Sequence, residues 1–458
     1  MKENSIKVHF LGASGTVTGS KFLLTTPEKN ILIDCGMFQG IKELREINWE
    51  PLPVDVGSID VVLLTHGHLD HTGYLPRLLK EGFRGKIIGT APTLAIAKII
   101  LLDSGKIHED EAQKANEEGY SKHKPAKPFY TVAEAETTLR LFQVEEKDKW
   151  IELSENIKYR FRYNGHILGA TFIELNIFGK IFVFSGDIGR EKDLLLYPPE
   201  RPKYADYLFM ESTYGNKLHP MESVSDKLVE LIKNTIHERG NLIIPSFAVE
   251  RLQTLMFLLW KLNKENRIFN IPIFVDSPMG NNVLSVFNSF PEWHKISGKE
   301  FGAMQNQMNI ITSYKETWET IDDSRPKVVI AGSGMVTGGR VLTYLSQMID
   351  RPSTTVLMVG YQAEATRGRQ LLEGANEVKI FGKYHPVRAE IHHIDSLSAH
   401  ADQQGLLDWT SEIENRPEEV FLIHGEATAQ DVLRVKLQDV YGWNVSIPKL
   451  YSVKEIRI

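Results

Sequence analysis

Short apolar runs, each closed by glycine or a polar residue, occupy the first part of the chain. The run at 59–65 reads IDVVLLT, which is typical of a buried strand. The same reasoning predicts strands at residues 7–11, 31–34, 59–65, 157–164, 171–178 and 180–187. Apolar residues at helical spacing predict helices at 72–81 and 92–102. This pattern indicates an α/β segment with many antiparallel hairpins.

After about residue 207 the chain changes to a longer alternation of apolar strands and amphipathic helices. The predicted strands are 241–247, 271–278, 327–334 and 354–360, and the predicted helices are 250–265, 338–349 and 367–374. Strands separated by helices of this length are typical of βαβ units on a parallel sheet. A last strand at 419–426 and helix at 431–440 are expected to rejoin the first domain.

Composition and charge narrow the class of protein. The 458 residues are 42% hydrophobic and 24% charged, which is ordinary for a globular chain and excludes a largely disordered one. A formal charge of -6 provides no global attraction for nucleic acid or anionic lipid, so any polyanion must bind through local groups. The single cysteine, Cys35, excludes an intramolecular disulfide and a thiolate-rich zinc finger.

Targeting and membrane segments are not indicated. The N-terminal sequence MKENSIKVHF lacks the apolar core of a secretory signal, and no apolar run approaches the ~20 residues that a transmembrane helix needs. We therefore expect a cytoplasmic protein with no membrane partner.

A dense group of metal-binding side chains follows the predicted strand at 59–65. His66, His68, Asp70 and His71 fall within six residues, just before a predicted helix. Imidazole and carboxylate groups are zinc ligands, and a strand-to-helix loop can direct its side chains at more than one metal. A surface loop with chance histidines is the alternative, and the crowding of three histidines argues against it.

The H-x-H-x-D-H motif resembles the signature of the metallo-β-lactamase superfamily, whose members have an αββα sandwich and usually a two-metal centre. Three further motifs follow the superfamily pattern: Asp34 in LIDCG, His166 in NGHILGA and Asp187 in FSGDIGR. The resemblance implies that Asp34 orients the metal ligands and that Asp187 bridges two metals. It assigns His66, His68 and His166 to one metal, and Asp70 and His71 to the other.

Two zinc ions are the implied cofactor, although manganese or iron could use the same nitrogen and oxygen ligands. In such a centre the metals lower the pKa of a shared water, and the resulting hydroxide attacks the substrate. The superfamily motif does not select the substrate, because β-lactams, thioesters, lactones and phosphodiesters are all hydrolysed on this fold.

Three motifs in the second half of the chain resemble those of the β-CASP nucleases, a branch with an α/β domain inserted into the hydrolase fold. They are Glu211 in FMESTYGN, His400 in SLSAHAD and His424 in FLIHGE. The resemblance places Asp70, Glu211 and His400 in the catalytic set, with His400 as general acid beside Glu211. His424 would complete the second metal site. A histidine at this last position resembles the members that act on RNA, so single-stranded RNA is the expected substrate.

Phosphate-binding groups are expected in the inserted region, in glycine-rich turns at 331–340 and 360–369 and in the segment 246–251. Backbone amides at such turns hold phosphates without a large net charge, and an aromatic ring can stack on a base. The predicted substrate-binding residues are Ser246, Phe247, Arg251, Ser333, Gly334, Arg340, Thr366 and Arg369, with Arg367 as a further donor.

The resulting prediction divides the chain into a metallo-β-lactamase domain at 1–207 and 396–458 and an inserted β-CASP domain at 208–395. The expected activity of the protein is that of a zinc-dependent ribonuclease, which cleaves endonucleolytically and has 5′ exonucleolytic cleavage as a second mode. The chain resembles compact bacterial and archaeal relatives of the cleavage subunit in pre-mRNA 3′-end processing. Two alternatives stay open, a hydrolase of a small ester or thioester and a noncatalytic RNA-binding scaffold; a homodimer is also allowed.

Overall fold

Two compact units make up the chain. The computed structural model describes residues 5–119, 123–220, 222–268, 271–360, 362–363 and 365–457. Unit 1 comprises Met1–Leu218 and His400–Ile458, and unit 2 comprises His219–Ala399. The domain boundaries expected from the sequence stay a prediction. In the described part of the chain, no helix combines the length and the apolar character that crossing a membrane requires.

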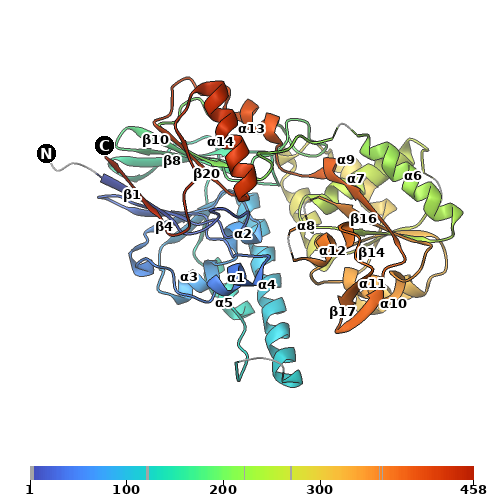
Figure 1. Cartoon of the computed structure of the whole chain (residues 1–458). Coiled ribbons are helices and arrows are strands. Elements are labelled where there is room, and N and C mark those ends of the chain that lie inside the picture. The colour runs from blue at the N-terminus through green and yellow to red at the C-terminus, as the bar shows by residue number, and fades with distance from the viewer. Residues whose placement is uncertain are drawn as a thin grey trace. The chain divides into compact units, whose positions relative to one another are not determined.

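Unit 1 is built on two seven-stranded mixed sheets (Figure 1). The first sheet contains, in spatial order, β22 (Val453–Arg457), β1 (Ser5–Phe10), β2 (Phe22–Thr25), β3 (Asn30–Ile33), β4 (Val61–Leu63), β5 (Lys86–Gly89) and β6 (Phe142–Val144). The second contains β21 (Val445–Ser446), β20 (Glu419–Ile423), β11 (Tyr207–Glu211), β10 (Lys180–Phe184), β9 (Thr171–Ile177), β8 (Ile157–Tyr163) and β7 (Ile151–Ser154). Each sheet is antiparallel at one end and parallel at the other.

The main core of unit 1 lies between the inner faces of these sheets. It includes a stack of aromatic rings in which Phe209 lies 4.1 Å from Phe184 and 4.8 Å from Phe421, measured between ring centroids. β8 shows why the sheet has one dry face, because its sequence IKYRFRY alternates buried apolar and half-buried basic residues.

Helices cover the outer face of each sheet in unit 1. In Figure 1, α13 and α14 lie over the second sheet, and α1, α3, α4 and α5 lie over the first. The helices are α1 (Lys42–Ile47), α2 (Leu69–Thr72), α3 (Leu75–Lys80), α4 (Ala91–Glu118), α5 (Val132–Leu139), α13 (Gln403–Thr410) and α14 (Ala427–Tyr441). Two sheets between two helical layers confirm the predicted αββα sandwich.

Helix α4 extends well beyond the predicted range of 92–102. Its second half has few buried residues, so it lacks the apolar periodicity on which the prediction depended. Ion pairs one turn apart join Lys106 to Asp110 and Lys114 to Glu118, and the helix ends at Gly119, whose φ of 69° is left-handed. The helix predicted at 72–81 corresponds to the shorter α3, and α2 shares only Thr72 with the predicted range.

Unit 2 contains a six-stranded parallel sheet, as the sequence predicts, and a separate hairpin. The sheet order is β14 (Asn309–Ile310), β13 (Ile273–Asp276), β15 (Lys327–Ala331), β12 (Asn241–Pro245), β16 (Thr354–Val359) and β19 (Glu390–Ile394), and the hairpin is β17 (Glu377–Ile380) with β18 (Lys383–Pro386). Strands β12, β15 and β16 are buried throughout, which is typical of parallel strands covered on both faces. The helices are α6 (Val224–His237), α7 (Arg251–Lys264), α8 (Pro278–Ser289), α9 (Gly298–Gln307), α10 (Tyr314–Asp322), α11 (Val341–Met348) and α12 (Arg367–Leu372).

Replacing Phe209 by alanine should lower the free energy of unfolding of unit 1 by about 3–5 kcal/mol, because a buried ring in contact with two others is lost and the cavity cannot fully collapse. Guanidinium unfolding followed by circular dichroism measures this change. The exposed Tyr384→Ala is the control, expected within about 0.5 kcal/mol of the parent. An unfolding curve of Phe209→Ala that overlays the parent curve would contradict this packing.

Candidate metal and catalytic centre

The carboxyl ends of parallel strands in unit 1 carry half of the residues predicted for the centre. Asp34 follows β3, and His66 follows the parallel neighbour β4 closely. In the second sheet, Asp187 follows β10, Glu211 ends β11 and His424 follows β20, and these three strands are parallel neighbours. Because parallel strands end at the same edge of a sheet, side chains far apart in sequence converge there.

The remaining predicted residues come from loops and from the short helix α2 at the same centre. His68 precedes α2, and Asp70 and His71 lie on that short helix. His166 lies between β8 and β9, and His400 lies just before α13. The structure therefore brings all the predicted metal-binding and catalytic residues together within unit 1, although their roles stay predictions.

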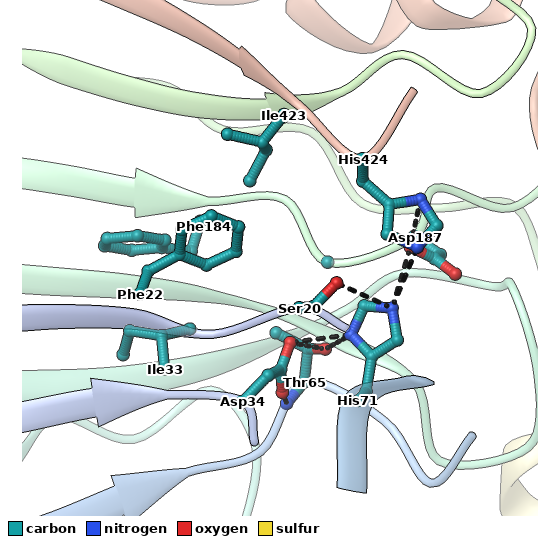
Figure 2. A pocket seen from close by; sticks show the side chains of 11 residues that line it. Ser20, Phe22, Ile33, Asp34, Thr65, His71, Phe184, Asp187, Ile423 and His424 are labelled. Carbon is teal, nitrogen blue, oxygen red and sulfur yellow. Dashed lines mark hydrogen bonds and ion pairs between the residues drawn. The ribbon is translucent and has the colours of Figure 1, made fainter. Parts of the chain in front are cut away.

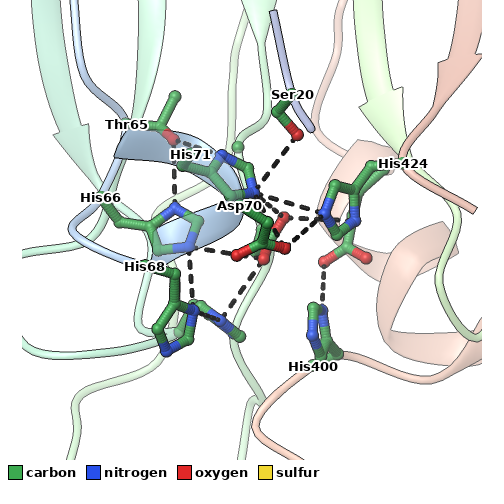
Figure 3. A network of polar contacts seen from close by, with 12 residues as sticks. Ser20, Thr65, His66, His68, Asp70, His71, His400 and His424 are labelled. Carbon is green, nitrogen blue, oxygen red and sulfur yellow. Dashed lines mark hydrogen bonds and ion pairs between the residues drawn. The ribbon is translucent and has the colours of Figure 1, made fainter. Parts of the chain in front are cut away.

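The first group of donor atoms consists of three imidazoles and one carboxylate (Figure 3). His68 Nδ1 lies 3.1 Å from His66 Nε2 and 3.3 Å from His166 Nε2. Asp187 Oδ2 lies 3.5 Å from both His66 Nε2 and His166 Nε2. Four buried or half-buried donors thus face a common point, which is the arrangement a tetrahedral zinc site requires.

The second group consists of Asp70, His71 and His424. His424 Nε2 lies 3.4 Å from Asp70 Oδ2 and 3.3 Å from His71 Nε2. Asp187 belongs next to this group as well, since its Oδ1 lies 3.3 Å from His71 Nε2. One oxygen of Asp187 therefore faces each group, as a bridging ligand would. A third combination, Asp187 with Glu211 and His424, shares residues with both.

The buried carboxylate of Asp187 gives a further indication that the donor groups can hold a cation. Asp187 is 2% exposed, and its Oδ1 accepts no hydrogen bond of good geometry, although His71 Nε2 lies 3.3 Å and His424 Nδ1 3.5 Å away. Buried carboxylate oxygens are normally hydrogen-bonded or paired with a cation, so this oxygen is available to bind a cation. The residues present therefore fit a metal ion.

The protonation states favour metal binding by several imidazoles. Burial and the neighbouring His71 hold the pKa of His66 well below its usual range, and burial and His400 do the same for the pKa of His166. Burial lowers the pKa of His68 to about 4. Although burial opposes it, contact with His424, His71 and His66 holds the pKa of Asp187 well below its ordinary value. Neutral imidazoles and an ionised carboxylate are the forms that bind metals.

Asp34 holds His71 in place from behind the centre (Figure 2). Its Oδ2 lies 2.8 Å from His71 Nδ1 and accepts a 2.8 Å hydrogen bond from the Thr65 hydroxyl, while Oδ1 accepts one from the Thr65 amide. The loop after Asp34 packs tightly on the ligand loop, because a Cβ on Gly36 would lie 1.5 Å from the Asp70 carbonyl oxygen. This carboxylate–histidine contact fixes the ring so that Nε2 faces the other donors.

A cavity of about 10 Å³ lies beside His71 and Asp187, bounded on the far side by Phe22, Phe184 and Ile423 (Figure 2). This volume holds about one water molecule and no substrate. The side chains of Asp70 and His400, each 18% exposed, and the half-buried His68 are accessible members of the centre. The donors are thus open to solvent at this side.

His400 and Glu211 form an ion pair at this accessible side. His400 Nδ1 lies 3.2 Å from Glu211 Oε1, and Glu211 is fully buried. Burial alone would lower the pKa of His400, but the Glu211 carboxylate, with Asp187 and Asp70, raises it to about 9. The geometry can therefore supply a protonated imidazole next to the metal-binding side chains.

The predicted substrate-binding residues all lie in unit 2. Ser246 follows β12 and Ser333 follows β15, at the carboxyl edge of the parallel sheet. Arg340 has internal partners, since Nη1 donates to Thr317 Oγ1 at 2.8 Å and the guanidinium lies 3.4 Å from the centroid of the Tyr314 ring.

The other members of this set also make contacts within unit 2. The ring of Phe247 packs directly against the backbone of Gly334, since a Cβ added at Gly334 would lie 2.6 Å from the ring. Thr366 caps α12, and Arg367 bonds the carbonyl of Lys379. The two remaining arginines pair with neighbouring acids, Arg251 with Glu250 and Arg369 with Glu373. Contact of these residues with substrate stays a prediction.

Three hydroxyl groups at the centre were missed by the sequence analysis. Thr65 Oγ1 lies 3.1 Å from His66 Nδ1 as well as bonding Asp34, and Ser20 Oγ lies 3.4 Å from His71 Nε2. Thr213 Oγ1 lies 3.2 Å from His424 Nδ1. Thr65 and Thr213 are adjacent to the predicted motifs and could have been considered there, whereas Ser20 carries no such signal.

Comparison with known proteins identifies the family to which the chain belongs. Family models match at residues 15–101 (metallo-beta-lactamase superfamily), 252–371 (Beta-Casp domain) and 384–448 (Zn-dependent metallo-hydrolase RNA specificity domain). Ribonuclease TTHA0252 of Thermus thermophilus is 34% identical over 96% of this chain and 97% of its own. The chain belongs to the β-CASP family of metallo-β-lactamase-fold hydrolases. The predicted family is thereby confirmed, and with it a metal-dependent hydrolase.

Other β-CASP relatives carry different names. An RNase J-like protein of Methanocaldococcus jannaschii is 30% identical over 92% of this chain and 93% of its own. Transcription termination factor FttA of Methanosarcina mazei is 30% identical over 93% of this chain and 68% of its own. A crystal structure of a protein of unknown function from Enterococcus faecalis covers 99% of this chain and 100% of its own, with a TM-score of 0.56 at 12% identity. That last likeness concerns the fold alone.

Replacing Asp34 by asparagine should weaken metal binding about 10–100-fold, because the partner that orients His71 loses its charge. Zinc titration of the apoprotein against a chromophoric chelator measures the affinity. Asp110→Asn, which changes an exposed carboxylate paired with Lys106, is the matched control and should bind zinc as the parent does. Equal affinities of Asp34→Asn and the parent would contradict the orienting role.

Proposed function

We propose that this β-CASP protein is a zinc-dependent ribonuclease that hydrolyses phosphodiester bonds in single-stranded RNA. Cleavage is endonucleolytic, with 5′ exonucleolytic cleavage as a second mode. The observation that carries the proposal is the joint geometry of unit 1, where two donor groups share Asp187 and the His400–Glu211 pair lies at their accessible side. A phosphodiester needs both charge neutralisation and a proton for the leaving oxygen, and this centre offers both.

The choice of RNA draws on the relatives. Two of them are named as ribonuclease and RNase J-like protein, and the domain matched at 384–448 is described as an RNA specificity domain. His424 provides an imidazole at the position where the family resemblance favours RNA over DNA. The formal charge of -6 accords with local rather than global attraction of the substrate.

Two metal ions are proposed, one held by His66, His68, His166 and Asp187, the other by Asp70, His71, His424 and Asp187. When bound, such ions supply Lewis acidity and a water of lowered pKa. Asp34 and Thr65 keep the imidazoles of His66 and His71 directed at the donor groups.

The protein's own acid is His400. Glu211 holds the imidazole through Nδ1 and favours its charged form, so Nε2 can give a proton to the alkoxide that leaves phosphorus. Glu211 is itself held by the amide of Ile188, which donates to its Oε1. Asp70 completes the catalytic set on the accessible side of the centre.

Two other activities fit the fold less well. A hydrolase of a small ester or thioester has no use for unit 2 or for the His400–Glu211 pair. A noncatalytic RNA-binding scaffold has no use for a full set of buried metal donors. A homodimer is compatible with all three activities.

Purified, zinc-loaded protein should cut a 5′-labelled single-stranded RNA into labelled internal fragments and leave the matching DNA intact. His400→Ala should slow RNA cleavage by about 10²–10⁴-fold with normal metal content, since the proton donor is lost. Denaturing gels resolve the products by length, and elemental analysis gives the metal content.

The outcomes separate the candidate activities. Early release of labelled mononucleotide would favour the 5′ exonuclease mode. An unchanged rate in metal-replete His400→Ala would remove the general-acid role. No cleavage of RNA or DNA with two metals bound would reject the nuclease and favour the small-ester hydrolase.

Removing the metals should abolish cleavage, and adding zinc back should restore it, because the charge neutralisation resides in the metal centre. The treatment is dialysis against a chelator followed by titration with zinc, with RNA cleavage as the readout. Circular dichroism must show that the apoprotein keeps its secondary structure. Full activity of folded, metal-free protein would contradict the metal-dependent mechanism.

A further inference from the structure

The two ring nitrogens of His424 have different surroundings. Nε2 faces the second donor group, at 3.4 Å from Asp70 Oδ2 and 3.3 Å from His71 Nε2. Nδ1 lies on the other side of the ring, 3.2 Å from the hydroxyl oxygen of Thr213 and 3.5 Å from Asp187 Oδ1. Which nitrogen carries the proton therefore decides whether His424 can offer Nε2 to a metal.

The segment after β11 also holds the backbone of His424. The carbonyl of His424 accepts hydrogen bonds from the Ser212 amide at 3.1 Å and from the Thr213 hydroxyl at 3.3 Å. Ser212 Oγ donates to the carbonyl of Ile423 at 2.7 Å. His424 has a φ of 48°, a left-handed conformation that a non-glycine residue keeps only when its surroundings hold it there.

The Thr213 hydroxyl has a single proton to give. Directed at the carbonyl oxygen of His424, which lies 3.3 Å away and can only accept, this proton leaves the Thr213 oxygen as an acceptor towards the ring. Asp187 Oδ1, 3.5 Å from Nδ1, can likewise only accept and favours a proton on the same nitrogen. Nδ1 then carries the ring proton and donates it to Thr213, and Nε2 keeps its lone pair. The opposite tautomer would place a proton on Nε2, between Asp70 and His71, where it would exclude a metal.

We propose that Thr213 is a positioning residue that fixes the tautomer and the orientation of His424 for metal binding through Nε2. Asp34 and Thr65 serve His71 in a comparable way, with a carboxylate oxygen 2.8 Å from His71 Nδ1. The atom nearer to His424 Nδ1 is instead the neutral Thr213 hydroxyl at 3.2 Å, with Asp187 Oδ1 at 3.5 Å. Thr213 thus orients the ring without placing another negative charge beside Asp187. This inference rests on the proposed role of His424 as a ligand of the second metal.

The experiment compares Thr213→Val, which keeps the shape and removes the hydroxyl, with Thr213→Ser, which keeps the hydroxyl. Thr138→Val is the matched control, because it removes a fully buried threonine hydroxyl elsewhere in unit 1 that bonds only the carbonyl of Glu134. Zinc binding to each apoprotein is measured by chelator competition, and thermal melting verifies that each variant is folded. Long-range ¹H–¹⁵N spectra of histidine-labelled, zinc-loaded protein report the His424 tautomer, assigned by the signal lost in His424→Gln.

Thr213→Val should weaken binding of the second zinc equivalent about 10–100-fold and leave the affinity for the first equivalent unchanged. Thr213→Ser should restore the second equivalent to within about threefold of the parent, and Thr138→Val should match the parent. The parent spectrum should show His424 with a protonated Nδ1 and zinc on Nε2.

Two results would overturn the inference in distinguishable ways. A parent that binds a second zinc, with a Thr213→Val variant that binds it equally well or a His424 that uses Nδ1, would reject the role of Thr213 alone. A parent that binds no second zinc would reject the proposed two-metal site and this inference with it.

Discussion

The carboxylate of Asp187 is the group around which unit 1 is organised. It is almost fully buried, and burying a charge without compensation costs several kcal/mol even in a protein interior. The imidazoles of His66, His71 and His166 lie within 3.5 Å of one or the other oxygen, and a cation held among them would compensate this charge. These imidazoles in turn must be supplied by loops from both sheets, so the sandwich has to close correctly before the charge is stabilised.

That closure depends on parallel strands ending at one edge. β10, β11 and β20 are neighbours in one sheet, and β3 and β4 are neighbours in the other. The polar segments that follow these five strands therefore lie close together. The aromatic stack of Phe184, Phe209 and Phe421 lies in these same strands of the second sheet and holds them from the apolar side. Packing in the core and chemistry at the edge are therefore properties of the same strands.

The supporting contacts of the centre come largely from residues next to the motifs. Thr65 precedes His66, Thr213 follows Glu211 closely, and the bare backbone of Gly36 lets the loop after Asp34 approach Asp70. Ligands and their supports thus arrive on the same short segments. Such segments tolerate little change in length, because a shift of one residue would move both the ligand and its partner.

The sequence by itself determined the fold class and half of the strands, and it predicted the donor side chains that the structure groups together, because apolar periodicity and dense histidine motifs are local signals. It underestimated α4, whose second half is exposed and has no apolar stripe, and it offered no sign that Arg340 is engaged with Thr317 and Tyr314. Only the tertiary structure decided which donors face each other. His71 and His424 are 353 positions apart and their Nε2 atoms lie 3.3 Å apart, a distance set by strand order and loop packing rather than by any local pattern.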